Sequence, residues 1–180
     1  MRSMKPLLGA LLLAVATGGP ASAQTAANAP AACENPNANL PPALAGWAKT
    51  PVPVVTAHDQ ASALKQPLRL GERGALSLAK TETIKFAHAP TEQMPKQYAY
   101  SGMVAFKVPK DGNYSVMISE ANWIDVIQNG QPIQSLDMRG RIPCVKYGKK
   151  IEFPLKTGDA VDQFFGAPYD HVDVLIAAAP

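Results

Sequence analysis

The three histidines of this sequence are the first candidates for chemistry, because imidazole binds metal ions and transfers protons. His171 and Asp173 are two residues apart, so in a β-strand both side chains would lie on one face. His58 or His88 would have to join them through the fold to complete a metal site. A surface pair is the commoner interpretation, so we expect no metal and no cofactor. A metal-binding protein or metal-dependent enzyme using His171 and Asp173 is the alternative function.

A cationic stretch near the C-terminal third is the second candidate site. It runs from residue 138 to 151 without an acidic residue and includes Gly140 and Gly148. A glycine-containing loop of this composition, held by Cys144, predicts a site for an anionic ligand such as a uronate, carboxylate or phosphate. A solvated loop with ordinary charges is the plainer interpretation. The cations of this stretch are Arg139, Arg141, Lys146, Lys149 and Lys150.

Trp123 is a further candidate, because the carboxylates of Glu120 and Asp125 flank it as in some sugar-binding sites. The plainer role of Asp125 is that of a strand residue that faces solvent or bonds a turn. Neither a Gly-x-Ser-x-Gly motif nor a phosphate-binding loop occurs, and we assign no catalytic residue. The residues predicted to bind a ligand are therefore Arg139, Arg141, Lys146, Tyr147 and Trp123.

The N-terminus is typical of a secretory signal peptide. Arg2 and Lys5 precede a short apolar run at 7–15, and Ala21-Ser-Ala23 is a small-x-small cleavage site. The run is shorter than the ~20 residues of a membrane span. We therefore expect cleavage after Ala23, no membrane span, and a location in the periplasm or outside the cell.

The charge of the mature chain excludes some partners. Removing Arg2 and Lys5 leaves 15 of the 17 Lys and Arg residues against 14 Asp and Glu, a net charge of +1. This balance gives no support to nucleic-acid binding. The partners that we expect are an anionic small molecule, a glycan or an envelope protein.

The two cysteines, Cys33 and Cys144, are predicted to form a disulfide, since exported proteins with an even cysteine count usually pair them. The bond would fix the N-terminal part of the mature chain. That part, residues 24–53, is rich in Ala, Asn and Pro and predicts an extended arm across a domain at 54–180. Trp47 is expected to anchor the arm by packing, with an exposed ligand platform as the sharper alternative.

The remaining chain has the period-two alternation of β-strands. One face of 100–108 carries Val104, Phe106 and Val108, and Pro109 to Gly112 then predicts a turn into a hairpin with 114–118. Asn129-Gly130 predicts a second hairpin, and Ile133 is a core candidate. Pro154 lacks an amide proton, which places its strand at a sheet edge or a bulge.

Other segments show the same alternation, and no long window has a helical period. The strands predicted here are 52–56, 76–78, 84–86, 122–128, 131–136, 149–155, 161–165 and 171–176, and Asp59 is expected to cap one helical turn at 59–64. The fold class is therefore all-β: an antiparallel β-sandwich or jelly roll of about seven to nine short strands.

Three short motifs resemble a known family. Phe106-Lys-Val108, Gly112-Asn-Tyr114-Ser-Val116 and the later 153–158 are similar to motifs of the bacterial pre-peptidase C-terminal-like β-sandwich. The resemblance covers about residues 75–177 and implies an accessory or binding module without transferred catalytic residues. The chain also resembles small exported bacterial proteins, some labelled homogentisate dioxygenase. A cupin-type iron dioxygenase needs a closely spaced His pair with a Glu, and this sequence has none.

These patterns together predict an exported, non-catalytic β-sandwich module that binds a ligand, a glycan or an envelope partner.

Overall fold

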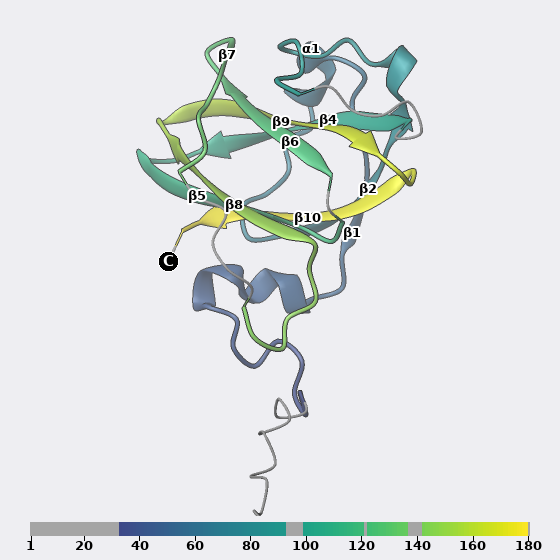
Figure 1. The fold of residues 1–180 in the computed structure, drawn as a ribbon. Coiled ribbons are helices and arrows are strands. Elements are labelled where there is room, and N and C mark those ends of the chain that lie inside the picture. The colour runs from purple at the N-terminus through teal and green to yellow at the C-terminus, as the bar shows by residue number, and fades with distance from the viewer. Residues whose placement is uncertain (1–32, 93–98, 121, 137–141, 180) are drawn as a thin grey trace, which may run out of the picture. The chain divides into compact units, whose positions relative to one another are not determined.

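The alternating apolar residues form two five-stranded sheets that pack face to face in the computed structural model (Figure 1). The structure describes residues 33–92, 99–120, 122–136 and 142–179. The first sheet has the order β1 (Val52–Val55), β2 (Arg73–Ser77), β10 (His171–Ala178), β5 (Gly112–Ile118), β8 (Lys149–Leu155). The second has the order β3 (Ala79–Lys80), β4 (Tyr100–Val108), β9 (Gly158–Ala167), β6 (Trp123–Gln128), β7 (Gln131–Pro132). The predicted sandwich is confirmed.

Successive strands from β4 onward alternate between the sheets, apart from the pair β6 and β7. The neighbours β2-β10-β5-β8 in one sheet and β4-β9-β6-β7 in the other are the connectivity of a jelly roll. The hairpin predicted from β4 into β5 is therefore wrong. The turn at Pro109 to Gly112 carries the chain from the second sheet to the first, where β5 pairs with β10 and β8.

The core lies between the sheets and uses the predicted faces. Val104, Phe106 and Val108 of β4 meet the valine and isoleucine side chains of β10 in one buried cluster. The β10 residues in this cluster are Val172, Val174 and Ile176, which the alternation also predicts. Burying each such side chain contributes about 1.5–3 kcal/mol.

The second predicted hairpin is confirmed at β6 and β7. Asn129 and Gly130 have positive φ angles of 53° and 74°, as a two-residue turn between twisted strands requires. The strand predicted to run on to residue 136 is shorter, because β7 ends at Pro132. Ile133 is partly buried against the core.

The strands of the two sheets differ from the prediction in direction and in number. The strand β1 pairs with β2 in parallel, so the sandwich is not purely antiparallel, and the described residues form ten strands where about seven to nine were predicted. Residues 84–86 contribute only an isolated bridge from Lys85 to Asp59. Pro154 lies on β8, the outer strand of the first sheet, as its missing amide proton predicts.

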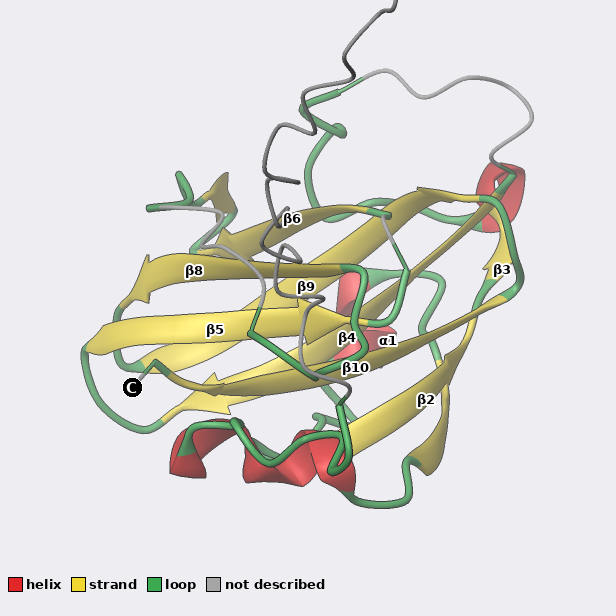
Figure 2. Cartoon of the chain, turned by 60° about the horizontal axis from the view of Figure 1, so that its bottom comes forward, coloured by secondary structure: helices red, strands yellow, loops and turns green. Residues whose placement is uncertain are grey.

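The described part of the predicted arm is not extended. Residues Pro42–Ala48 form a 3-10 helix, η1, against the outer face of the first sheet (Figure 2). Proline is tolerated in a first helical turn because its missing N–H would have no intrahelical partner there. Trp47 is 2% exposed and its Nε1 donates to the Lys146 carbonyl at 2.9 Å, so it is a packing anchor.

The predicted disulfide between Cys33 and Cys144 is present and ties this segment to the loop before β8. The remaining short helices cover the second sheet or its edge: α1 (Gln60–Ala63), capped by Asp59 as predicted, and η2 (Thr81–Thr83). Among the described residues, no helix is long and apolar enough to cross a membrane. The predicted leader, with its cleavage after Ala23, and the arm up to residue 32 lie outside the described residues.

Candidate functional site

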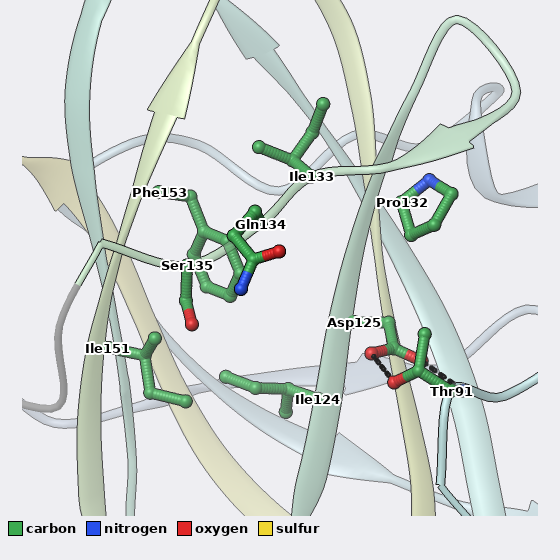
Figure 3. A pocket seen from close by; sticks show the side chains of 9 residues that line it. All are labelled: Thr91, Ile124, Asp125, Pro132, Ile133, Gln134, Ser135, Ile151 and Phe153. Carbon is green, nitrogen blue, oxygen red and sulfur yellow. Dashed lines mark hydrogen bonds between the residues drawn. The ribbon is translucent and has the colours of Figure 1, made fainter.

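A hollow of about 270 Å³ opens between the edges of the two sheets, where β6 of one sheet faces β8 of the other (Figure 3). Ile151 and Phe153 of β8 form one wall, and Thr91 and Asp125 lie on the opposite side. The residues that line the hollow are Thr91, Ile124, Asp125, Pro132, Ile133, Gln134, Ser135, Ile151 and Phe153.

The hollow exists because the chain crosses from one sheet to the other after β7. Ile133 still donates its N–H to the Val126 carbonyl at 2.8 Å, beside β6. Leu136 donates to the Glu152 carbonyl at 2.8 Å, on β8. Residues 133–136 therefore bridge the open edge of the sandwich, and the first half of β6 has only β9 as a neighbouring strand.

The polar wall is a hydrogen-bond network around the carboxylate of Asp125, which is 8% exposed. Thr91 donates its N–H to Oδ2 at 3.1 Å and its hydroxyl to Oδ1 at 2.7 Å. The indole Nε1 of Trp123 donates to Oδ1 at 3.1 Å. Asp125 thus bonds a loop, as its plainer interpretation predicts, and fixes Thr91 and Trp123 beside the hollow.

The rest of the lining combines apolar walls with free polar groups at the mouth. Ile124, Ile151 and Phe153 are buried, whereas Gln134 and Ser135 are exposed and present an amide and a hydroxyl. Small-molecule sites usually have this composition, with apolar walls and a few convergent polar groups.

Lys149, the first residue of β8, points from the first sheet toward the second. Its Nζ lies 3.5 Å from the Asn122 carbonyl oxygen and 4.8 Å from the centre of the Trp123 ring. Burial lowers the pKa of Lys149, an effect that the negative charge of Asp125 only partly opposes.

Asp162 lies on the inner face of β9, in register with Val104 and Val126. It is 0% exposed, and neither carboxyl oxygen has a hydrogen-bond partner among the described residues. Burial, followed by the charge of Asp125, raises its pKa well above the usual value, so the carboxyl is held in the neutral form.

Of the predicted ligand-binding residues, the structure describes Lys146, Tyr147 and Trp123, and it does not bring these three together. Tyr147 is buried with Trp47 on the outer face of the first sheet, and its hydroxyl accepts the Ile142 N–H at 2.7 Å. Lys146 is exposed, and Trp123 belongs to the second sheet. Arg139 and Arg141 lie outside the described residues.

His171 and Asp173, the proposed metal pair, each contact a different partner. Asp173 accepts hydrogen bonds from Nε and Nη2 of Arg73, and the His171 ring lies 3.1 Å from the Asp170 carboxylate. His58 and His88 contact backbone carbonyls elsewhere. Within the described ranges, no three His, Cys, Asp or Glu side chains are grouped to hold a metal ion. The metal alternative on His171 and Asp173 is therefore not supported.

The sequence alone does not reveal most residues of the hollow. Gln134 and Ser135 carry no motif, and Thr91 reaches Asp125 across 34 residues of chain. Asp162 could be singled out from the sequence as a buried carboxyl, because the alternation of Ala160, Asp162 and Phe164 puts it on the apolar face of the strand.

Replacing Asp125 with alanine is expected to lower the free energy of unfolding by about 1.5–3 kcal/mol, because four donors lose a charged acceptor. Urea unfolding measures this loss. Asp125→Asn keeps one acceptor oxygen and should lose less. An alanine variant as stable as the wild type would show that the network does not hold the loop.

No family model, curated protein or solved structure matches this chain. The resemblance of residues 75–177 to the pre-peptidase C-terminal-like sandwich therefore stays a prediction. What is established is the class: a jelly-roll β-sandwich with one disulfide between Cys33 and Cys144.

Proposed function

We propose that this protein is a non-catalytic, exported binding module that holds a small hydroxylated ligand, such as a sugar unit, in the hollow between β6 and β8. The observation that carries the proposal is the hollow itself, with apolar walls on one side and convergent polar groups on the other.

The chemistry of the lining supports a hydroxylated ligand. A sugar ring has apolar C–H faces that fit against Phe153 and Ile151, and hydroxyls that fit the amide of Gln134 and the hydroxyl of Ser135. The one carboxylate of the lining, Asp125, already accepts four hydrogen bonds at 2.7–3.5 Å. A group so engaged orients its neighbours, which supports binding over catalysis.

Export is supported by two independent features. The disulfide indicates an extracytoplasmic compartment, because cytosolic thiols are kept reduced. The sequence at 1–23 has the features of a cleavable leader. We place the mature protein in the periplasm or the medium.

The site is tested with a variant that fills the hollow. Ser135→Trp places an indole at its mouth and should abolish binding of ligands that the mature wild-type protein selects from an array of neutral and acidic glycans. The matched control is Gln66→Trp, in a second hollow of about 290 Å³ beside α1. Unchanged binding by Ser135→Trp, or loss by both variants, would contradict the proposed site.

The acidic part of the array tests the cationic loop separately. If the ligand carries a carboxylate, Arg139→Ala with Arg141→Ala should weaken binding of acidic glycans and leave binding of neutral glycans unchanged. Equal binding of acidic glycans by this double variant would remove both arginines from the site.

A further inference from the structure

The contacts of the Lys149 amine differ from those of Lys150 and Lys156, which each lie beside a carboxylate. Lys150 lies 2.7 Å from the Glu152 carboxylate and Lys156 lies 3.0 Å from that of Asp111. The described contacts of the Lys149 Nζ are instead a long hydrogen bond to the Asn122 carbonyl and the face of the Trp123 ring. Neither contact provides a full negative charge to hold the proton of the ammonium group.

Two neighbours connect Lys149 to the hollow, although Lys149 is not itself one of the lining residues. Ile151 follows two residues later on the same face of β8 and forms part of the hollow's wall. The Trp123 ring that Lys149 covers donates its Nε1 proton to Thr91 and Asp125, which line the opposite side. Lys149 therefore contacts a residue, Trp123, that hydrogen-bonds two residues of the lining.

We propose that Lys149 is a nucleophilic amine that forms an imine with a small hydroxylated carbonyl compound, such as a hydroxyaldehyde or an open-chain sugar, held in this hollow. The choice of ligand rests on the proposed function, whereas the reactivity of the amine does not. A half-buried lysine without an ion-pair partner has a larger share of neutral amine than a solvated lysine, and the neutral amine is the nucleophile. Burial lowers the pKa of Lys149 in the same direction.

The reaction balances without a further reagent. The lone pair of the neutral Nζ attacks the carbonyl carbon while the C=O π electrons move to oxygen. A proton passes from nitrogen to that oxygen and gives a carbinolamine. Loss of the hydroxyl with a proton as water leaves the C=N bond, so amine and aldehyde become imine and water. The imine is reversible, and an added hydride donor traps it as a secondary amine.

The test is site-resolved trapping on the mature, disulfide-bonded protein. Glyceraldehyde and cyanoborohydride are added near neutral pH, and peptide mass spectrometry follows the modification of each lysine with time. Lys149 should be modified roughly threefold or more faster than the exposed Lys146, and Lys150 should be slower than both. A rate at Lys149 equal to or below that of Lys146 would overturn the proposal.

Formaldehyde separates the amine from the hollow, because it is small enough to need no binding site. Ser135→Trp should slow the trapping of glyceraldehyde at Lys149 and leave that of formaldehyde unchanged, while Gln66→Trp affects neither. If Lys149 reacts fast with both aldehydes in every variant, the link between the amine and the hollow is refuted, whereas the proposed function is decided separately by the glycan array with Ser135→Trp. Lys149→Arg should remove the fast-reacting site without changing the rates at the other lysines.

Discussion

Replacing Asp162 with valine is expected to raise the free energy of unfolding by about 1–3 kcal/mol, the usual cost of a buried polar group without a partner. The carboxyl lies between Val104 and Val126 on the inner face of the second sheet and has no hydrogen-bond partner among the described residues. Valine has a similar volume and matches its neighbours. Urea unfolding of the wild type and Asp162→Val measures the gain.

The pH dependence provides a second measurement on the same group. Burial raises the pKa of Asp162 in the folded protein, while in the unfolded chain the pKa of the carboxyl returns to its ordinary value of 3.8. The folded state therefore binds the proton more tightly, and stability falls as pH rises from the unfolded pKa toward the folded one. Asp162→Asn cannot ionise, so it should lose less stability than the wild type as pH rises above the unfolded pKa of this carboxyl.

Asp159 is the matched control, because it lies on the same strand and is exposed. Asp159→Asn should leave both the stability and its pH profile nearly unchanged. If Asp162→Val is less stable than the wild type, and Asp162→Asn follows the same pH profile as the wild type, then Asp162 has polar partners or solvent contact in solution.

Removing the disulfide is expected to have the largest effect on stability. The bond joins residues separated by 111 positions. Its closure restricts the unfolded chain, which is worth about 4–5 kcal/mol for a loop of this length. The double variant Cys33→Ser with Cys144→Ser should lower the free energy of unfolding by that amount in urea, and reduction of the wild type should have the same effect.

Removing the disulfide should also destabilise the buried cluster on the outer face of the first sheet. The bond lies beside the cluster of Leu44, Trp47 and Tyr147, which covers Met117 and Leu175. Trp47 fluorescence should shift to longer wavelength at a lower urea concentration in the double variant than in the wild type. Coincident unfolding curves for the oxidised, reduced and doubly substituted proteins would contradict this role.

The sequence predicts the faces of the strands better than their partners. Alternation depends on local geometry, so it places Val104 and Val174 in the core correctly. It does not determine which strand lies alongside, and for that reason the hairpin from β4 to β5 is wrong. The hairpin predicted from Asn129-Gly130 is confirmed, because the positive φ angles of these two residues specify a tight turn directly.

The arm and the site show the same distinction between local and long-range causes. Pro41 and Pro42 predict that no regular helix forms, yet they occupy the N-cap and first position of η1, where proline is tolerated. The hollow arises from the crossing of residues 133–136 between two sheets, which no local pattern encodes. Closeness in sequence does not show that Tyr147 packs with Trp47 on the outer face of the first sheet, and the predicted site at Arg139 and Arg141 stays a prediction.

The proposed binding site between β6 and β8 is tested most directly by NMR of the ¹⁵N-labelled mature protein. The chemical shifts of the backbone amides are followed while glyceraldehyde or a neutral sugar selected on the array is added. The proposed site predicts saturable shifts at Ile124, Ser135 and Ile151, which line the hollow, and loss of these shifts in Ser135→Trp. Shifts confined to the second hollow around Val55 and Gln66, or no saturable shift at all, would contradict it.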